Sequence, residues 1–203
     1  MIKAIIFDFG DVFINLDKSG ALENALDLFE INEFSEDLIQ TNMLYEMGQM
    51  DSATFIEFYL NRFPKCSRQD IIEAWNFILR DFPIYRLNFL KQLQRKKKFE
   101  LILLSNTNEM HIDFIKNHVP FYEEFKSCFQ KFYLSHEIKM RKPDAITFEY
   151  VLNDIGLRAK ECLFIDDTKE NTDAAEQIGI HTWNINENSE DVIDLFSIKA
   201  TLF

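Results

Sequence analysis

The feature that most constrains the fold is a set of three short apolar runs that each stop abruptly on polar residues. The runs cover residues 4–7, 101–104 and 163–165, and the polar residues that follow them are Asp8, Ser105 and the pair Asp166 and Asp167. Unbroken apolar runs of this length are typical of strands in a parallel sheet that is covered on both faces. Open α/β folds bind ligands beyond the carboxyl ends of their strands. These polar side chains are therefore candidates for a functional site.

The same polar residues also have a simpler interpretation. Aspartate and glycine are common in turns, so Asp8, Asp11 and the Asp166 and Asp167 pair could do no more than reverse the chain. The wider set of residues weighs against this alternative, because Lys142 before a proline completes a series in chain order. A carboxylate, a hydroxyl, a lysine and two adjacent carboxylates form a set that is suited to phosphoryl transfer, because they can supply a nucleophile, fixed donors and a metal site.

The second half of the chain alternates between strand and helix patterns. We expect strands at residues 99–104, 131–134, 162–165 and 181–185, and helices at residues 85–98, 109–117, 144–155, 168–178 and 189–198. Strands that alternate with helices form a parallel sheet with helices packed on its faces. The predicted fold class is therefore α/β, with a doubly wound parallel sheet.

Residues 20–83 interrupt this alternation and carry only helical patterns. Asp51 or Ser52 marks one helix start, and Ser67 marks another, with Asp70 three residues later in a capping-box arrangement. Gly48 follows a helix end. This all-helical block lies between the first two strands of the predicted sheet.

Together these stretches resemble the four motifs of the haloacid dehalogenase-like (HAD) hydrolase superfamily, which carries the same residue types at the ends of such strands. The resemblance extends over nearly the whole chain. It implies a Rossmann-like core at residues 1–14 and 85–203 and an inserted all-helical cap at residues 15–84. Three segments are most similar to the bacterial glucose-1-phosphate phosphatase branch, namely residues 104–108, 133–143 and 165–171.

In this chemistry a carboxylate attacks phosphorus and forms an acyl phosphate that can be cleaved again. Asp8 is the candidate nucleophile. Because its charge repels the phosphate, a divalent cation must lie between them, and Mg²⁺ favours oxygen ligands. The candidate protein ligands are Asp8, the Gly10 carbonyl, Asp167 and Asp166. Asp167 is preferred over Asp166 because it and Asn171 match the four-residue spacing of the family's fourth motif.

Fixed donors must meet the charge that develops on the transferred phosphoryl oxygens. We expect Ser105 and the backbone N–H of Asn106 to donate hydrogen bonds, and Lys142 to supply a positive charge. Ser105 could instead cap the following helix, and a single lysine before proline is commonly just exposed. Lys139 and Arg141 lie beside Lys142, and we expect the three to form a positive focus in an acidic protein.

The chain departs from the phosphatase pattern at one position. Phosphatases of this superfamily usually carry a second aspartate two residues after the nucleophile, which protonates the leaving group, and here that residue is Gly10. The resembled branch also tolerates glycine there. Asp11 is the candidate replacement, but adjacent side chains of an extended segment point in opposite directions. We therefore favour a site in which Asp11 points away and the leaving group departs without an acid.

A formal charge of −12 argues against nucleic acid or anionic membrane as a partner. The three cysteines have no spacing typical of a metal site, and we expect reduced thiols in a cytoplasmic protein. No apolar stretch reaches the length of a membrane span, and Met1 leads into a strand rather than a signal segment.

The leading interpretation is a Mg²⁺-dependent phosphatase that acts on a small phosphorylated metabolite, with a sugar phosphate favoured. Two alternatives stay open. One is a sugar phosphomutase, which would protect its aspartyl phosphate from water. The other is a catalytically silent phosphate-binding or regulatory protein, which the glycine at position 10 motivates. The sequence names neither the substrate nor the oligomeric state.

Overall fold

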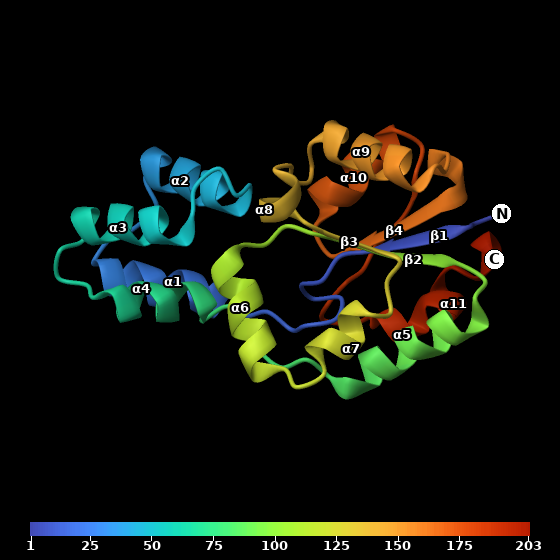
Figure 1. Ribbon diagram of the computed structural model, residues 1–203, viewed down its shortest axis with the longest axis horizontal. Coiled ribbons are helices and arrows are strands. Elements are labelled where there is room, and N and C mark those ends of the chain that lie inside the picture. The colour runs from blue at the N-terminus through green and yellow to red at the C-terminus, as the bar shows by residue number, and fades with distance from the viewer.

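A computed structural model describes all 203 residues of the protein. Its centre is a sheet of five parallel strands in the order β3-β2-β1-β4-β5 (Figure 1). The strands are β1 (Ala4–Phe7), β2 (Glu100–Ser105), β3 (Lys131–Leu134), β4 (Cys162–Asp166) and β5 (His181–Asn184). The first strand of the chain therefore lies in the middle of the sheet. The predicted α/β fold class is confirmed, and every expected strand is present.

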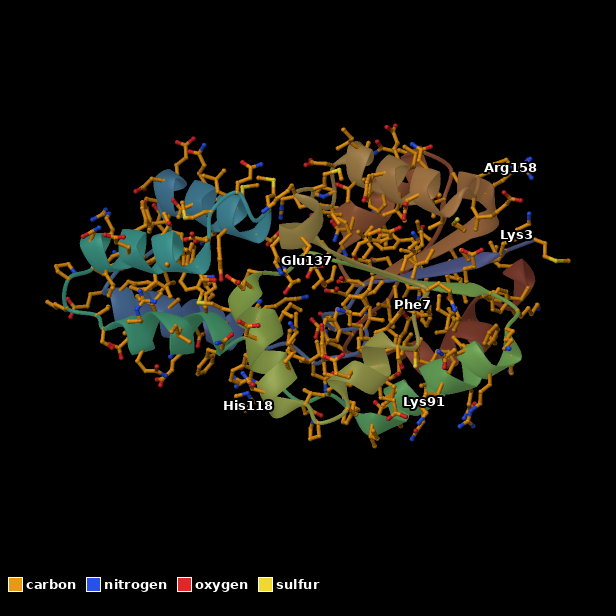
Figure 2. The ribbon with its side chains drawn as sticks, viewed as in Figure 1. Lys3, Phe7, Lys91, His118, Glu137 and Arg158 are labelled. Carbon is orange, nitrogen blue, oxygen red and sulfur yellow. The ribbon has the colours of Figure 1, made fainter.

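Helices cover both faces of the sheet, as its doubly wound topology requires. One face carries α5 (Ile84–Lys96), α7 (Tyr122–Lys126) and α11 (Leu195–Ile198), and the other carries α9 (Ala145–Ile155) and α10 (Lys169–Gln177) (Figure 1). Successive residues of β1 serve the two faces in turn, because Ile5 and Phe7 pack with the first set and Ala4 and Ile6 with the second. Figure 2 shows Phe7 between the sheet and the first set, and Lys91 of α5 at the outer surface.

Four further helices form a lobe beside the sheet. This helical lobe consists of α1 (Lys18–Phe29), α2 (Glu36–Glu46), α3 (Ser52–Arg62) and α4 (Arg68–Asn76) (Figure 1). Its interior is rich in aromatic rings, and the Phe55 ring lies 4.1 Å from that of Tyr45 and 4.7 Å from that of Trp75. Met110, from α6 (Glu109–His118), belongs to the same buried cluster. The lobe and the core therefore share one apolar contact through α6.

Hydrogen-bonded caps fix two helix starts of the lobe. The Asp51 carboxylate accepts a hydrogen bond from the Thr54 N–H at 2.8 Å, so Asp51 rather than Ser52 is the N-cap of α3. Ser67 and Asp70 form the expected capping box at the start of α4, in which each side chain accepts from the other's backbone N–H.

The remaining short elements complete the core. They are α8 (Ser135–Ile138) and three 3₁₀ helices, Ala159–Glu161, Val192–Asp194 and Ala200–Leu202. None of the helices is both long enough and apolar enough to cross a membrane.

Two chain segments that run antiparallel to each other connect the helical lobe to the core. The Asn15 N–H donates to the Asp81 carbonyl, the Arg80 N–H to the Asn15 carbonyl and the Asp17 N–H to the Ile78 carbonyl, each at 2.9 Å. Beyond this pairing, Phe82 lies in the main core, with its ring 5.0 Å from that of Phe125. Residue 82 thus packs with the sheet, although it falls inside the range 15–84 that the sequence assigns to the cap.

Candidate active site

The carboxyl edge of the sheet brings together polar residues from three adjacent strands. Asp8 follows β1, Ser105 ends β2 and Asp166 ends β4, and β1 pairs with both of its neighbours in parallel. Lys142 reaches the same place from the segment between α8 and α9. The side chains that the sequence singles out for phosphoryl transfer are therefore neighbours in space.

Lys142 lies at the centre of this group and is almost completely buried. Its Nζ lies 2.8 Å from Asp8 Oδ1 and 2.6 Å from Asp166 Oδ2, and 5.3 Å from the centre of the Phe164 ring. Burial lowers the pKa of Lys142, but the charges and hydrogen bonds of the two carboxylates outweigh this effect and raise the pKa above its usual value. The lysine is therefore a fixed positive charge between two carboxylates.

Asp8 has an unusual electrostatic environment for an aspartate. Burial raises its pKa from 3.8 to about 7, and the positive charge of Lys142 only partly opposes this shift. Its Oδ1 atom is buried and accepts no well-directed hydrogen bond, although Lys142 lies nearby. A buried carboxylate with free lone pairs beside its lysine partner is suited to binding a cation as well.

The donor set fits a magnesium ion. Carboxylate oxygens of Asp8, Asp166 and Asp167 all lie within 4.8 Å of one another. Asp166 is fully buried and already accepts hydrogen bonds from Lys142, from the Thr168 N–H and from Asn171. The Asp8 and Asp167 side chains each contact a single lysine, so more of their oxygen lone pairs are free for a metal ion. This difference favours Asp167 over Asp166 as a ligand.

The structure does not support the spacing argument behind that preference. The Asn171 side chain donates to both oxygens of Asp166 at 3.1 Å, so its contact is with the first carboxylate of the pair and not with Asp167. Asn171 therefore orients Asp166, while Asp167 is the carboxylate that remains nearer the open side of the site.

Gly10 has a local steric reason to lack a side chain. A Cβ atom built on Gly10 would lie 2.6 Å from Leu16 Cδ1. An aspartate at this position, as in the usual phosphatase pattern, would have to displace the Leu16 side chain. The glycine at position 10 therefore allows the Leu16 side chain of the connecting segment to pack against the loop.

Asp11 was expected to point away from the site because side chains alternate along an extended segment. The backbone of Asp11 is not extended, so this reason does not apply. Its φ is +53°, in the left-handed region, and its carboxylate accepts a hydrogen bond from the Leu16 N–H at 2.9 Å. The other oxygen lies 2.8 Å from Lys18 Nζ. Asp11 therefore shapes the loop and binds Lys18.

Lys18 is a site residue that the sequence analysis missed. Its Nζ bridges Asp11 and Asp167, and it is the first residue of α1. Burial lowers the pKa of Lys18, but the hydrogen bonds with the two carboxylates outweigh it and raise the pKa above its usual value. Lys18 is 149 positions from Asp167, and no local pattern connects them.

Ser105 and Asn106 have different surroundings. The Ser105 hydroxyl is buried and has only a 3.5 Å contact, to the Asn106 carbonyl, so it can donate to a ligand. The Asn106 side chain donates to the Lys142 carbonyl at 2.8 Å and accepts from the Lys142 N–H at 2.9 Å. Asn106 thereby fixes the backbone that carries Lys142, a role that its expected use of a backbone N–H did not include.

A cavity of about 170 Å³ adjoins these residues and lies between the core and the helical lobe. Gly10, Ser105 and Asn106 line it on the core side, and Glu46 and Ile78 line it on the lobe side. The cavity has room for a small molecule attached to a phosphate. Its position makes it the candidate substrate pocket.

Asn108 and His111 give this cavity fixed polar groups. Asn108 is the N-cap of α6, accepting from the His111 N–H at 3.0 Å, and His111 Nε2 lies 2.9 Å from the Trp75 carbonyl. Burial lowers the pKa of His111 to about 4, so the ring is neutral near pH 7 and donates from Nε2. His111 therefore connects α6 with α4.

Of the three residues expected to form a positive focus, Lys139, Arg141 and Lys142, the first two have side chains that are held by other contacts within the protein. Lys139 Nζ donates to the Gly48 carbonyl, and Arg141 Nε lies 2.7 Å from Glu46 Oε1. These residues attach the end of α2 to the core, and only Lys142 points into the site.

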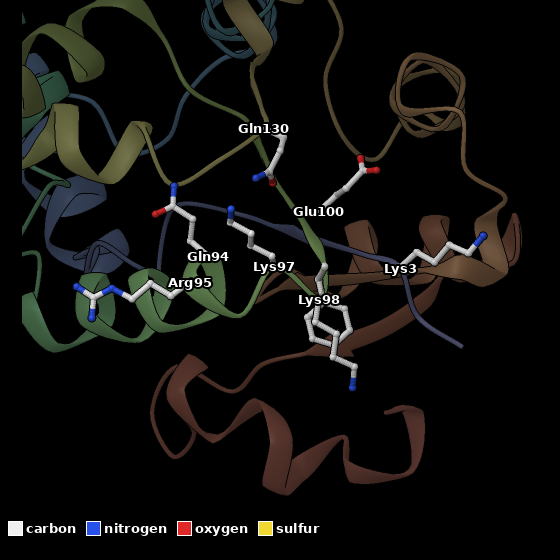
Figure 3. Close-up of a pocket in the computed structure, with 8 residues that line it drawn as sticks. Lys3, Gln94, Arg95, Lys97, Lys98, Glu100 and Gln130 are labelled. Atoms are coloured by element: carbon white, nitrogen blue, oxygen red, sulfur yellow. The ribbon is translucent and has the colours of Figure 1, made fainter.

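A larger hollow, of about 700 Å³, lies at the opposite edge of the sheet. Its basic residues are Lys3, Arg95, Lys97 and Lys98, and Figure 3 shows their side chains pointing in different directions. Lys98 Nζ lies 5.0 Å from the centre of the Phe99 ring. The hollow contains no hydroxyl side chain and no pair of carboxylates, and its basic run lies at the end of α5, where positive side chains meet the negative end of the helix dipole.

Comparison with known proteins gives three close relationships. The chain is 27% identical over 201 residues to a D-ribitol-5-phosphate phosphatase of Bacteroides thetaiotaomicron, covering 94% of this chain and 95% of that protein. A mutant HAD family enzyme from the same species, solved in complex with magnesium and inorganic phosphate, has a TM-score of 0.84 and 33% identity, with coverage of 97% and 99%. A HAD-like family hydrolase from Porphyromonas gingivalis has a TM-score of 0.83 and 25% identity, with coverage of 100% and 98%.

A family model agrees with these relationships and with the geometry of the site. The model of the haloacid dehalogenase-like hydrolases matches residues 2–179, which include all the polar groups at the carboxyl edge of the sheet. The chain belongs to the haloacid dehalogenase-like hydrolase family.

Proposed function

We propose that the protein is a Mg²⁺-dependent phosphatase of a small sugar or polyol phosphate, and that it works through an aspartyl phosphate on Asp8. The observation that carries the proposal is the buried group of Asp8, Lys142 and Asp166, with Asp167 beside it. A named relative that is a phosphatase of a phosphorylated polyol supports the substrate class. We further propose that the helical lobe is the cap over this site.

In the first step, an oxygen of Asp8 attacks phosphorus, and the bond from phosphorus to the leaving oxygen breaks with its electron pair on that oxygen. Lys142 favours the ionised form of Asp8 and stabilises the phosphoryl charge, while Ser105 donates a hydrogen bond. Asp8, the Gly10 carbonyl and Asp167 would hold Mg²⁺, with Asp166 next to them, and the ion would neutralise the phosphate. The released oxygen takes a proton from water. A second water then attacks phosphorus, the bond from phosphorus to Asp8 breaks with its electron pair on the carboxylate, and inorganic phosphate leaves.

The cavity supports a short hydroxylated substrate. Its volume of about 170 Å³ leaves little space for a nucleotide or a peptide. Glu46, Asn108 and His111 supply polar atoms along its wall, which suits hydroxyl groups. Because a 5-phosphate of a pentitol is the ester of a primary alcohol, this class would have a poor leaving group at a site with Gly10 in place of the usual acid.

Two alternatives stay in view. A phosphomutase would use the same Asp8 and Lys142, and a silent phosphate-binding protein would use the same donors without turnover. The contacts of Asp11 with Leu16 and Lys18 favour neither alternative directly, but they support a site in which Asp11 does not replace the missing acid.

The decisive experiment is to measure phosphate release from ribitol 5-phosphate, glucose 1-phosphate and 4-nitrophenyl phosphate, with Mg²⁺ and with EDTA. We expect release that requires Mg²⁺. Binding without release would favour the silent protein, and transfer of phosphate between sugar positions would favour the mutase. The dependence of turnover on leaving-group pKa, for the wild type and Asp11→Asn, then decides whether Asp11 assists. A shallow dependence that steepens in the variant would make Asp11 the acid.

We also propose that the protein acts in the cytoplasm. Its three cysteines form no disulfide, and Cys128 and Cys162 are buried. Free thiols are typical of a reducing compartment.

A further inference from the structure

Lys18 joins the helical lobe to the carboxylates of the candidate metal site. Its Nζ lies 2.8 Å from Asp11 Oδ2 and also binds Asp167 Oδ2. It is the only residue of α1 that forms an ion pair or a hydrogen bond with the core. About half of its side chain is exposed, whereas the carboxylates of Asp11 and Asp167 are each less than a tenth exposed. The contact therefore links a solvent-accessible lobe residue to a buried acidic site.

The backbone before Lys18 is held firmly, so the side chain is aimed at the site by its surroundings. The Asp17 N–H donates to the Ile78 carbonyl at 2.9 Å, and the Asp17 carboxylate accepts from the Gly20 N–H at 2.8 Å and pairs with Arg80. Asp17 thus caps α1 and fixes the connecting segment at the same time. The ammonium group of Lys18 is the part of this first turn that reaches the buried carboxylates of Asp11 and Asp167.

One divalent cation would balance the net charge of the site. Four carboxylates and two ammonium groups meet there, namely Asp8, Asp11, Asp166, Asp167, Lys18 and Lys142. In their ionised forms four negative and two positive charges leave a net charge of −2. Lys142 is bound to Asp8 and Asp166 and is buried, so it is a permanent part of this balance. Lys18 is the exchangeable part, because it lies on Asp167.

We propose that Lys18 competes with the divalent cation for Asp167, and that binding of the cation loosens the first turn of α1 from the core. The inference rests on Asp167 being a ligand in the proposed function. An ammonium group and Mg²⁺ on one carboxylate repel each other even when they use different oxygens. By linkage, the free energy with which the Lys18 contact holds α1 on the core makes the binding free energy of the cation less favourable.

Mg²⁺ affinity, measured by calorimetry with the ion alone, tests the competition. Lys18→Met should bind Mg²⁺ about tenfold more tightly than the wild type, the size expected for removing one half-exposed like charge. Lys18→Arg keeps the charge and should stay close to the wild type. Lys65→Met makes the same change in net charge at the far end of the lobe, where Lys65 pairs with Glu30, and should also stay close to the wild type.

Each other result has a defined meaning. Unchanged or weaker binding by Lys18→Met would overturn the proposal, and so would equal tightening by Lys65→Met, which would reduce the effect to net charge. Absence of Mg²⁺ binding by the wild type would instead overturn the metal site of the proposed function, and this inference with it.

Hydrogen exchange of the wild-type protein tests whether binding of the cation loosens α1, and it needs no variant. Amides in the first turns of α1, residues 21–24, should exchange faster when Mg²⁺ is added, while those of α3 should not. Equal or slower exchange at residues 21–24 would overturn the coupling between the ion and α1.

Discussion

Lys142 is the side chain on which the buried charges of the site depend. It touches both Asp8 and Asp166, so changing Lys142 removes a partner from both carboxylates, whereas changing either carboxylate leaves Lys142 bound to the other. Breaking a buried ion pair by removing the shared partner commonly costs several kcal/mol, because the remaining charges stay buried. Residues of the same site should therefore differ sharply in their effect on stability.

We expect Asp8→Asn to abolish phosphate release and to leave the fold intact. The amide is a poor nucleophile, so turnover should fall by a factor on the order of a thousand or more, while Lys142 keeps its bond to Asp166. Lys142→Met is the contrasting variant and should lose both activity and about 3 kcal/mol of stability. Turnover and the free energy of unfolding in urea measure the two effects. Phosphate release by Asp8→Asn at the wild-type rate would end the aspartyl-phosphate mechanism.

The raised pKa of Asp8 predicts how the stability of the metal-free protein depends on pH. Burial raises this pKa from 3.8 to about 7, so the folded state binds the proton more tightly than the unfolded state does. The free energy of unfolding should therefore decrease as the pH rises from about 4 to about 7. Denaturation in EDTA at a series of pH values measures this, with Asp8→Asn as the control that lacks the group. Parallel curves for the two proteins would contradict the prediction.

At the scale of elements, the connection between the helical lobe and the core decides where the two can be separated. The Asp17 N–H binds the Ile78 carbonyl, so the chain ends left by removing residues 18–78 are adjacent. Removing residues 15–84 would also take away Phe82, whose ring contacts those of Phe9, Phe13, Phe121 and Phe125.

Deletion of residues 18–78, with a short glycine bridge, should leave a core that unfolds cooperatively, whereas deletion of 15–84 should not. Loss of a buried phenylalanine typically costs about 3–5 kcal/mol. Met110 would be uncovered in both cases, so Met110→Gln is built into both proteins to keep solubility equal. Thermal unfolding followed by near-UV circular dichroism distinguishes them. Equal cooperativity would show that Phe82 is dispensable to the core.

The strands could be predicted from the sequence because they are buried on both faces and read as unbroken apolar runs. The buried faces of the helices were harder to predict, since Leu22, Ile39 and Met43 have helical spacing with apolar neighbours and yet are 40–51% exposed. Periodicity identifies an apolar stripe, but the packing partner decides which part of it is covered. The helix α7 was not predicted, because five residues are too short for a periodic pattern.

The site residues that directly follow buried strands could be predicted for the same reason as the strands themselves. Asp8, Ser105 and Asp166 could be placed because a strand ends at each of them. Lys18 could not, because its partners are brought to it only by the folding of the lobe against the core. The orientation of Asp11 also escaped, since a positive φ at a non-glycine residue leaves no pattern in the sequence.

At the scale of the whole molecule, the net charge of −12 opposes the approach of an anionic substrate. Arg141 is paired with Glu46, so it does little to offset this field. We expect kcat/KM to rise about two- to fivefold as the ionic strength increases from low salt to about 0.2 M, because salt screens the repulsion. Mg²⁺ is kept saturating so that salt does not act through the ion. A decrease in kcat/KM would show that a local positive field dominates.

The central position of β1 has a consequence for synthesis on the ribosome. Ala4 pairs with Glu100 on one side and with Cys162 on the other, so the first strand to leave the ribosome waits for both of its neighbours. The four helices of the lobe, which follow β1 in the chain, pack mainly on each other and can form meanwhile, since contacts close in sequence form fastest. Until its partners are made, the nascent chain exposes a strand that is apolar on both sides. We therefore expect chaperones to be needed most during translation of the stretch between the first and second strands.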